Sequence, residues 1–248
     1  MTATTDFDRF VSHYEEALTR GLSVTGEDRA YFSRRRIDWL SHRLGALGVR
    51  AESVLDFGCG NGDSAPDLRA ILGARRVVGV DASRGSLEAA RRAHGSDRIS
   101  FLHPDEYRPA ADIDVAYTSG VFHHIRPRHR AEAFAYVRQT LRPGGVFAFW
   151  ENNPWNPGTR YVMWRIPFDR DAAPLSPPES RTRLRGGGFQ ILHTDFLFLF
   201  PRGLSGLRFL EHPLAGLPLG GQYLILCRKP SDASRRDGRG DAPEGPRP

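Results

Sequence analysis

The segment Val54-Leu55-Asp56-Phe57-Gly58-Cys59-Gly60-Asn61-Gly62 determines the fold class that we expect for this chain. An apolar run of strand length leads directly into a loop with glycine at every second position. Glycine permits positive φ and lets backbone amides approach a ligand closely. In open α/β sheets, nucleotides bind at the loop after the first strand. The segment therefore predicts a nucleoside-containing ligand at the carboxyl end of a parallel strand.

The spacing of these glycines disfavours two common nucleotide-binding loops. A dinucleotide-binding loop has its third glycine three positions after the second, but Asp63 occupies that position and would place a carboxylate near a pyrophosphate. The sequence also contains no Gly-Lys-Ser or Gly-Lys-Thr, so it has no Walker loop. NAD and a P-loop nucleotide are both disfavoured.

An acidic residue ends the second predicted strand, Val77-Val78-Gly79-Val80-Asp81, 25 residues after Asp56. A carboxylate at this place can accept hydrogen bonds from both hydroxyls of a ribose. The structural alternative is a solvated aspartate, or a cap for a helix that starts near Ser83. We predict that Asp81 holds the ribose.

Short β-branched runs alternate with helical segments after residue 52, which predicts a parallel sheet with helices on both faces. The last run has no crossover helix of ordinary length before it, so we expect an antiparallel hairpin at the edge. The predicted strands are Ser53–Phe57, Arg76–Asp81, Ile99–His103, Asp114–Thr118, Val146–Glu151, Phe189–Phe200 and Gln222–Arg228.

The two ends of the chain differ from this central part. Apolar residues at helical spacing predict two helices within residues 1–50, the second capped by Thr25 with Asp28 and ended by Gly48. We expect residues 1–50 to form a helical lid and residues 51–229 to form the α/β domain. Residues 230–248 have no large apolar side chain and predict a disordered tail.

The composition is that of a water-soluble globular protein, with 40% hydrophobic and 26% charged residues among 248. No apolar run spans a bilayer and no secretory signal is evident, so we expect a cytoplasmic protein. Cys59 and Cys227 are too few for a disulfide framework or a thiolate zinc site. Lys229 is the one lysine among 35 basic residues, and the scattered arginines indicate GC-rich codon usage. No nucleic-acid or membrane partner is expected.

The order of motifs resembles class I S-adenosylmethionine-dependent methyltransferases of the small-molecule type, such as the methyltransferase domain 11/25 or ubiquinone-biosynthesis-like group. The resemblance covers roughly residues 50–152 and is more specific than a lone glycine motif. It implies a Rossmann-like, doubly wound seven-stranded sheet, mostly parallel with an antiparallel last strand, and S-adenosylmethionine as cofactor. The motifs are the glycine loop, Asp81, Phe101–Asp105, Asp114–Ile125 and Leu141–Gly145.

The same resemblance assigns roles to residues around the glycine loop. Asp56 and the loop backbone would surround the methionine part of the cofactor, Asp81 would hold the ribose, and Asp105 with Glu106 would flank the adenine. Pro104 departs from the family pattern and removes a backbone amide. The implied cofactor-binding residues are Asp56, Gly58, Cys59, Gly60, Asp81, Ala82, Asp105, Glu106 and Ser119.

Two histidines after the fourth predicted strand, His123 and His124, are candidates for a general base. On an extended segment they would face opposite ways, so we expect one of them to reach the pocket. The resemblance favours His123, because the family tends to place a substrate-facing residue there and to pack the histidine that follows. The alternative is that both pack or hold the loop, because alignment alone can suffice for methyl transfer at a sulfonium. Adjacent histidines chelate a metal poorly, and we expect no metal site.

Polar and aromatic residues after the fifth predicted strand are candidates for contact with the acceptor. Amides could hydrogen-bond a polar substrate and aromatic rings could enclose it, although core or lid packing is the alternative. Asn153-Pro154-Trp155 is similar to the Asn-Pro-Pro-Tyr motif of enzymes that methylate amide or adenine nitrogens. That motif follows the fourth strand, whereas this segment follows the fifth, so methylation of nucleic acid or glutamine is disfavoured. The run Arg34–Arg36 could meet an anionic substrate, although a solvated helix face is the commoner meaning of such a run. The candidate substrate contacts are Asn152, Asn153, Trp155 and Tyr161, together with Tyr14 of the N-terminal helices, which the resemblance places over substrate and cofactor.

These observations predict methyl transfer from S-adenosylmethionine to a small-molecule acceptor, at a hydroxyl oxygen, in biosynthetic or specialised metabolism. One alternative is a cofactor-binding fold that catalyses a non-methylating step such as cyclisation, because fold does not determine chemistry. Another is a non-catalytic subunit that binds a cofactor or a partner. We expect a monomer or a homodimer.

Overall fold

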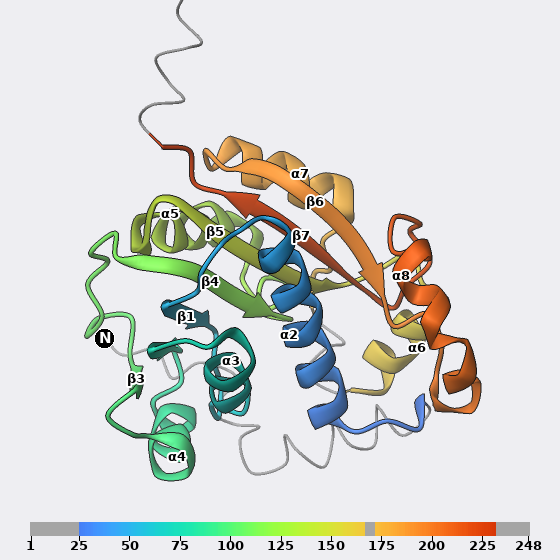
Figure 1. Ribbon diagram of the computed structural model, residues 1–248, viewed down its shortest axis with the longest axis horizontal. Coiled ribbons are helices and arrows are strands. Elements are labelled where there is room, and N and C mark those ends of the chain that lie inside the picture. The colour runs from blue at the N-terminus through green and yellow to red at the C-terminus, as the bar shows by residue number, and fades with distance from the viewer. Residues whose placement is uncertain (1–24, 167–171, 232–248) are drawn as a thin grey trace, which may run out of the picture.

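The structure, a computed structural model, describes residues 25–166 and 172–231. Their strands form a seven-stranded sheet in the order β3-β2-β1-β4-β5-β7-β6 (Figure 1). Strands β1 to β5 pair in parallel, whereas β7 is antiparallel to both β5 and β6. The expected doubly wound sheet with an antiparallel last strand is confirmed. The strands are β1 (Ser53–Phe57), β2 (Arg76–Val80), β3 (Ile99–Leu102), β4 (Ile113–Ser119), β5 (Leu141–Asn152), β6 (Gln190–Leu197) and β7 (Gln222–Arg228).

Helices cover both faces of the sheet. Buried side chains of α2, α3 and α4 belong to one hydrophobic cluster, and those of α5 and α7 belong to the other. Figure 1 shows α2 lying across the sheet, and α6, η5 and α8 near the right-hand ends of β5, β6 and β7. The helices are α2 (Arg29–Ala46), α3 (Ala65–Leu72), α4 (Arg84–His94), η3 (Pro127–His129), α5 (Arg130–Thr140), α6 (Pro157–Arg165), α7 (Pro177–Gly186), η5 (Arg202–Leu210) and α8 (Glu211–Leu214).

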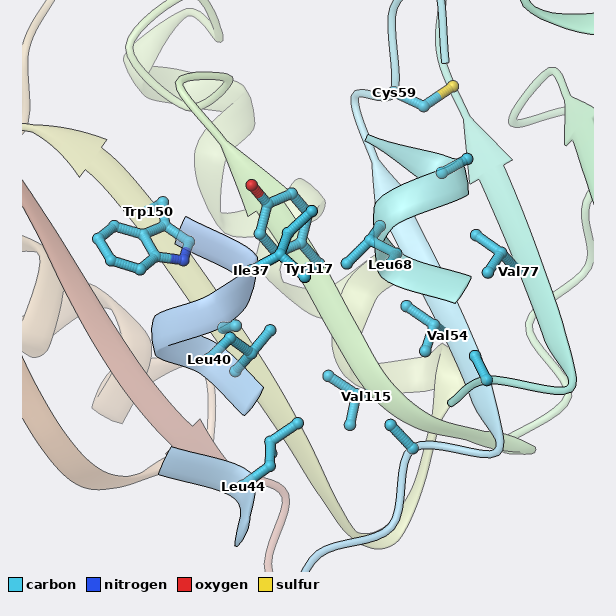
Figure 2. Packing of buried hydrophobic residues seen from close by; sticks show 14 of the residues in the cluster. Ile37, Leu40, Leu44, Val54, Cys59, Leu68, Val77, Val115, Tyr117 and Trp150 are labelled. Carbon is cyan, nitrogen blue, oxygen red and sulfur yellow. The ribbon is translucent and has the colours of Figure 1, made fainter. Parts of the chain in front are cut away.

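The apolar strands are buried on both faces because successive side chains of a strand point to opposite sides. In β1, Val54 belongs to the cluster under α2, α3 and α4, whereas Leu55 belongs to the cluster under α5 and α7. Figure 2 shows the first cluster, in which Ile37 and Leu40 of α2 lie over the sheet near Tyr117 and Trp150. Two separate cores therefore hold the sheet between its helices.

A buried carboxylate connects helix α2 to β6, an edge strand of the sheet. Asp195 of β6 accepts hydrogen bonds from Trp39 Nε1 at 2.8 Å, Arg43 Nε at 2.7 Å and Arg43 Nη2 at 2.6 Å. The helix is capped by Asp28, whose side chain accepts from the Tyr31 amide at 2.7 Å. The expected cap, Thr25, instead accepts from the amide of Glu27. The capping prediction was therefore wrong by three residues.

Parts of the expected organisation lie outside the described residues. These are the first predicted helix with Tyr14, and nearly all of the predicted tail. The boundaries of the lid and the tail stay predictions. Within residues 25–166 and 172–231, no helix is both long and apolar enough to cross a membrane.

Candidate functional site

Two aspartates lie at the carboxyl ends of β1 and β2, which are adjacent parallel strands. Asp81 Oδ2 accepts a hydrogen bond from the Gly60 amide at 2.9 Å, and Asp81 Oδ1 accepts one from the Ser83 amide at 2.8 Å. Ser83 in turn caps α4, so the helix-capping alternative belongs to Ser83 and not to Asp81. A carboxylate oxygen has more than one lone pair. Asp81 can therefore position the glycine loop and also accept from ligand hydroxyls.

Asp56 is buried behind this loop, and its Oδ2 atom has no hydrogen-bond partner among the described residues. Burial, followed by the charge of Asp81, raises the pKa of Asp56 from 3.8 to about 7, and the Arg36 guanidinium opposes this shift. A buried carboxylate oxygen without a partner is costly. A cationic ligand group beside it would remove that cost and favour the ionised form. The Asp56 carboxylate thus fits the ammonium of an amino acid.

The glycines of the loop face different surroundings. Gly58 has φ +75°, and a Cβ atom there would lie 2.4 Å from Val121 Cγ2. Gly62 is enclosed by Phe101, whose ring would be 2.6 Å from a Cβ atom. A Cβ atom on Gly60, at φ +53°, would meet no atom within 4 Å. Gly60 is therefore the member of the loop with open space beside it.

Cys59 differs from its neighbours in this loop. Its side chain is buried in the core cluster that lies under α2, α3 and α4, as Figure 2 shows. Burial raises the pKa of its thiol well above the ordinary value, with the charge of Asp56 adding to the effect. The side chain is a neutral core residue, so contact with a ligand in the loop would come from the Cys59 backbone.

The residues expected to flank adenine lie at the surface after β3. Glu106 accepts a hydrogen bond from the His103 amide at 3.0 Å and pairs with Arg84 at 3.0 Å and Arg91 at 3.4 Å. The His103 amide, followed by the Arg84 side chain, holds the pKa of Glu106 below its usual value. Asp105 is exposed and lies 3.2 Å from His103 Nδ1. Ala82, just after Asp81, is also exposed. Their contact with a ligand stays a prediction.

A polar cluster that the sequence did not predict lies beside Asp56. Tyr117 of β4 pairs in register with Asp56 and is almost fully buried. Its hydroxyl accepts from Arg36 Nε at 3.3 Å. Arg36 Nη1 donates to Gln222 Oε1 at 2.9 Å. A tyrosine within a buried strand needs a partner for its hydroxyl, and this signal could have indicated the cluster.

The segment after β4 is a turn, which overturns one expectation. The His124 amide donates to Val121 O at 3.0 Å and the Ile125 amide donates to Phe122 O at 3.1 Å. Because the segment is not extended, His123 and His124 do not face opposite ways, and their ring centroids are 4.1 Å apart. His123 is 4% exposed, whereas His124 is half-buried.

A buried glutamate holds this turn against β5. Glu151 Oε2 lies 2.6 Å from His123 Nδ1, and Glu151 Oε1 accepts from the Phe122 amide at 2.8 Å. A carboxylate acceptor at Nδ1 places the basic lone pair of a neutral imidazole on Nε2. A Cβ atom on Gly120 would lie 3.5 Å from His123 Cε1, so the ring edge lies close to the end of β4. The pair has the arrangement of a base with its orienting carboxylate.

The two asparagines after β5 have structural partners. Asn153 is fully buried, and its Nδ2 donates to Pro218 O at 3.2 Å and Gly220 O at 2.8 Å. Its Oδ1 accepts from the Trp155 amide at 3.1 Å. The Asn153 side chain thus holds the loop before β7, and its contact with a substrate stays a prediction. Asn152 Oδ1 accepts from Gln222 Nε2 at 3.1 Å and remains half-buried.

The aromatic residues near α6 are not part of the core. Trp155 is 53% exposed, Tyr161 is 50% exposed and Trp164 is 65% exposed. The rings of Tyr161 and Trp164 are stacked, with centroids 6.2 Å apart. Helix α6 follows the carboxyl end of β5, which is the edge of the sheet that carries Asp56 and Asp81. Contact of Trp155 and Tyr161 with an acceptor stays a prediction.

Comparisons with known proteins agree with this geometry. Residues 54–145 match a family model described as a methyltransferase domain. A trans-aconitate 2-methyltransferase of Azoarcus sp. (strain BH72) is 36% identical over 100 residues, which are 40% of this chain and 38% of that protein. The chain thus spans well under half the length of that relative.

Solved structures share the fold. An S-adenosylmethionine-dependent methyltransferase from Mesorhizobium loti superposes with a TM-score of 0.55 at 23% identity, over 73% of this chain and 92% of that one. The cyclase SpnF superposes with a TM-score of 0.54 at 18% identity, over 78% of this chain and 82% of that one. At these identities the two likenesses concern the fold.

Proposed function

This chain carries a class I S-adenosylmethionine-dependent methyltransferase domain, and we propose on that premise that it transfers the methyl group of S-adenosylmethionine to a hydroxyl oxygen of a small molecule. The proposal places the reaction in biosynthetic or specialised metabolism. It also places the protein in the cytoplasm, as a monomer or a homodimer.

The observation that carries the proposal is the pair of carboxylates beside Gly60. Asp81 is held at the end of β2 by the Gly60 and Ser83 amides, and Asp56 presents a buried oxygen that has no partner within residues 25–166 and 172–231. In our assignment, Asp81 binds the ribose hydroxyls and Asp56 binds the ammonium of the methionine part. The Arg36 guanidinium, bonded to Tyr117 and Gln222, adds positive charge on the side of α2. Together these groups suit a ligand that is both a nucleoside and a zwitterionic amino acid.

The reacting residues in our proposal are His123 and Glu151. When bound, S-adenosylmethionine would supply a methyl group on a sulfonium, from which a neutral thioether departs as a good leaving group. Glu151 orients the imidazole through Nδ1, and His123 Nε2 accepts the proton of the acceptor hydroxyl. His124 lies against the His123 ring and would support its position. General-base catalysis of this kind contributes on the order of 10²–10⁴-fold.

The acceptor would lie between the turn after β4 and the aromatic residues near α6. Trp155 and Tyr161 have exposed rings that can cover an apolar or aromatic acceptor, and Asn152 offers an amide at the end of β5. The name of the Azoarcus relative specifies trans-aconitate, which is a small molecule. A small-molecule acceptor is consistent with both observations.

The test of the cofactor assignment is calorimetry with S-adenosylmethionine. We expect the wild-type protein to bind it, and Asp81→Asn to bind roughly 10–100-fold more weakly, because hydrogen bonds to a charged group are lost. Asp97→Asn, at an exposed position before β3, should bind as the wild type does. Equal affinity in all three proteins would remove Asp81 from the site.

The test of the reaction is mass spectrometry with methyl-labelled cofactor and a panel of hydroxyl compounds. Gain of the labelled methyl group by a compound supports methyl transfer. A product of unchanged mass would instead favour a rearrangement or cyclisation, for which the fold of the cyclase SpnF is a precedent. Cofactor binding without any product would favour a non-catalytic subunit.

A further inference from the structure

Two histidines meet on the surface, away from the carboxylates of the candidate site. His42 of α2 and His212 of α8 are both exposed, and their Nε2 atoms are 3.1 Å apart. Their ring centroids are 4.9 Å apart, with the ring planes close to perpendicular. The residues are 170 positions apart in the chain. The contact therefore depends on how α2 and α8 pack.

Both backbones that carry these rings are firmly held. Trp39, one turn before His42, is buried, contacts both imidazoles and donates to Asp195. Glu211, just before His212, is buried and accepts from the amides of Leu199 and Phe200. The backbone segments that carry the two imidazoles are already ordered in the folded protein. Little further conformational entropy is therefore lost when both rings bind one ligand.

The charged groups around the pair are mostly neutralised. Arg43, next to His42, is held by both oxygens of Asp195, and Arg35 lies 3.5 Å from the Glu211 carboxylate. Asp38 precedes His42 by four residues and so places a carboxylate one helical turn away on the same side of α2. These pairings reduce the repulsion that a bound cation would otherwise meet from the arginines.

The distance between the two Nε2 atoms suits two ligands of one metal ion. Nitrogen ligands lie about 2.0–2.1 Å from Zn²⁺, which at a tetrahedral angle separates two of them by about 3.3 Å. Imidazole suits Zn²⁺, Ni²⁺ and Cu²⁺, whereas Mg²⁺ and Ca²⁺ prefer oxygen ligands. One ring would carry its proton on Nδ1 in place of Nε2, so that both Nε2 lone pairs face the ion.

We propose that His42 and His212 form a surface site for a divalent transition-metal ion, which links α2 to α8. Within the described residues no group of three or more His, Cys, Asp and Glu side chains gathers as a metal cage. Water would complete the coordination, and the site would bind and exchange metal reversibly. Because α2 also carries Arg36, the ion would stabilise the helix that contributes to the Tyr117 cluster.

The test compares thermal unfolding of tag-free, full-length protein with and without Zn²⁺ or Ni²⁺. At about 100 times the Kd of the metal, we expect the Tm of the wild type to rise by about 5–10 °C. His42→Gln and His212→Gln should each lose this rise, and Mg²⁺ should produce none. His129→Gln is the matched control, because His129 is also exposed but pairs with Glu132 instead of a histidine.

A second readout is electron paramagnetic resonance of the Cu²⁺ complex. We expect one ion per chain with two nitrogen ligands in the wild type and in His129→Gln, and no such signal from His42→Gln or His212→Gln. All three substituted positions are surface side chains, so circular dichroism should show unchanged folding. Equal metal effects in all proteins, or no metal effect in the wild type, would overturn the proposal.

Discussion

Glu151 Oε2 and His123 Nδ1 lie 2.6 Å apart in a place that is almost closed to solvent, where Glu151 is 1% exposed and His123 is 4% exposed. The other oxygen of Glu151 accepts from the Phe122 amide. One carboxylate thus holds both the turn after β4 and the protonation pattern of the imidazole. The relationship links a residue of β5 to the residue that we propose as the base.

The first prediction concerns Glu151→Gln. An amide can accept from Phe122 through its oxygen, but its NH₂ group would then donate to His123 Nδ1 and move the ring proton to Nε2. The base would be lost while the shape remains. We expect kcat to fall by roughly 10²–10⁴-fold with little change in the KM for S-adenosylmethionine.

Steady-state kinetics of methyl transfer over a range of pH measures this effect. Glu132→Gln is the control, because Glu132 pairs with His129 at 3.8 Å on the surface, and it should retain the activity of the wild type. Full activity and an unchanged pH profile in Glu151→Gln would show that His123 packs the turn and does not act as a base.

The second prediction concerns the pH dependence of stability at Asp56. Burial raises the pKa of Asp56 from 3.8 to about 7. Between these values the folded protein keeps a proton that the unfolded chain has released, so the free energy of unfolding falls as pH rises through this range. Asp56→Asn lacks this penalty. The stability of Asp56→Asn relative to wild type should therefore increase from about pH 4 to about pH 7, by up to ~4 kcal/mol.

Urea unfolding of both proteins at several pH values measures this difference. The same substitution should weaken binding of S-adenosylmethionine, because the negative partner for its ammonium is lost. Asp97→Asn, at an exposed position, is the control for the loss of a carboxylate. A difference in stability that stays constant with pH would contradict the raised pKa.

The third prediction contrasts two glycines of one loop. Gly58→Ala would place its methyl 2.4 Å from Val121, at positive φ, so we expect the free energy of unfolding to fall by about 2–4 kcal/mol. Gly60→Ala meets no neighbouring atom, so only the backbone cost of about 1 kcal/mol applies. Its methyl would instead enter the open space beside Asp81. We expect Gly60→Ala to fold but to bind S-adenosylmethionine at least about tenfold more weakly.

Thermal melting and calorimetry of the two variants distinguish these outcomes. If Gly60→Ala binds the cofactor normally, then the loop backbone at Gly60 does not face the ligand. If Gly58→Ala is as stable as the wild type, then Val121 can move away from the loop.

The fourth prediction concerns the carboxylate that ties α2 to β6. Asp195→Ala leaves the Arg43 guanidinium and the Trp39 Nε1 group without their acceptor, and we expect a loss of about 3 kcal/mol. This corresponds to a fall in Tm of about 6–12 °C. Asp112→Ala breaks an ion pair of equal length, 2.6 Å to Arg76, but at an exposed place, and should cost less than about 1 kcal/mol. Similar losses in the two variants would contradict this account of α2.

The sheet could be predicted from the sequence because its signals are local. Strands β1 and β7 begin and end at the predicted residues, and the antiparallel last strand was expected because no crossover helix of ordinary length precedes it. Strand β5 was predicted from Val146 but begins at Leu141, since Leu141 pairs with Ile113 across a shift of register. A pairing between separate strands leaves no trace in local composition.

The site was predicted in part, and the reason differs between its two halves. The glycine loop and the acids at 56 and 81 stand out because positive φ favours glycine, and because the carboxyl ends of adjacent parallel strands lie at the same edge of the sheet. The Arg36–Tyr117 contact joins residues 81 positions apart. The sequence indicated Asn153 as a polar residue near a cleft. In the structure, its side chain donates hydrogen bonds to carbonyl groups of the loop before β7.

The order of apolar runs, glycines and acids along the chain was enough to predict an α/β sheet and to propose the edge at which a nucleoside ligand binds, because backbone freedom and side-chain alternation act between near neighbours. Only the tertiary structure determined which groups form hydrogen bonds with the buried polar side chains. Glu151 reaches His123 from 28 positions away, and Asp195 reaches Trp39 from 156. Such contacts depend on the order of strands in the sheet and on the helix packed above it, and no spacing within one segment encodes them.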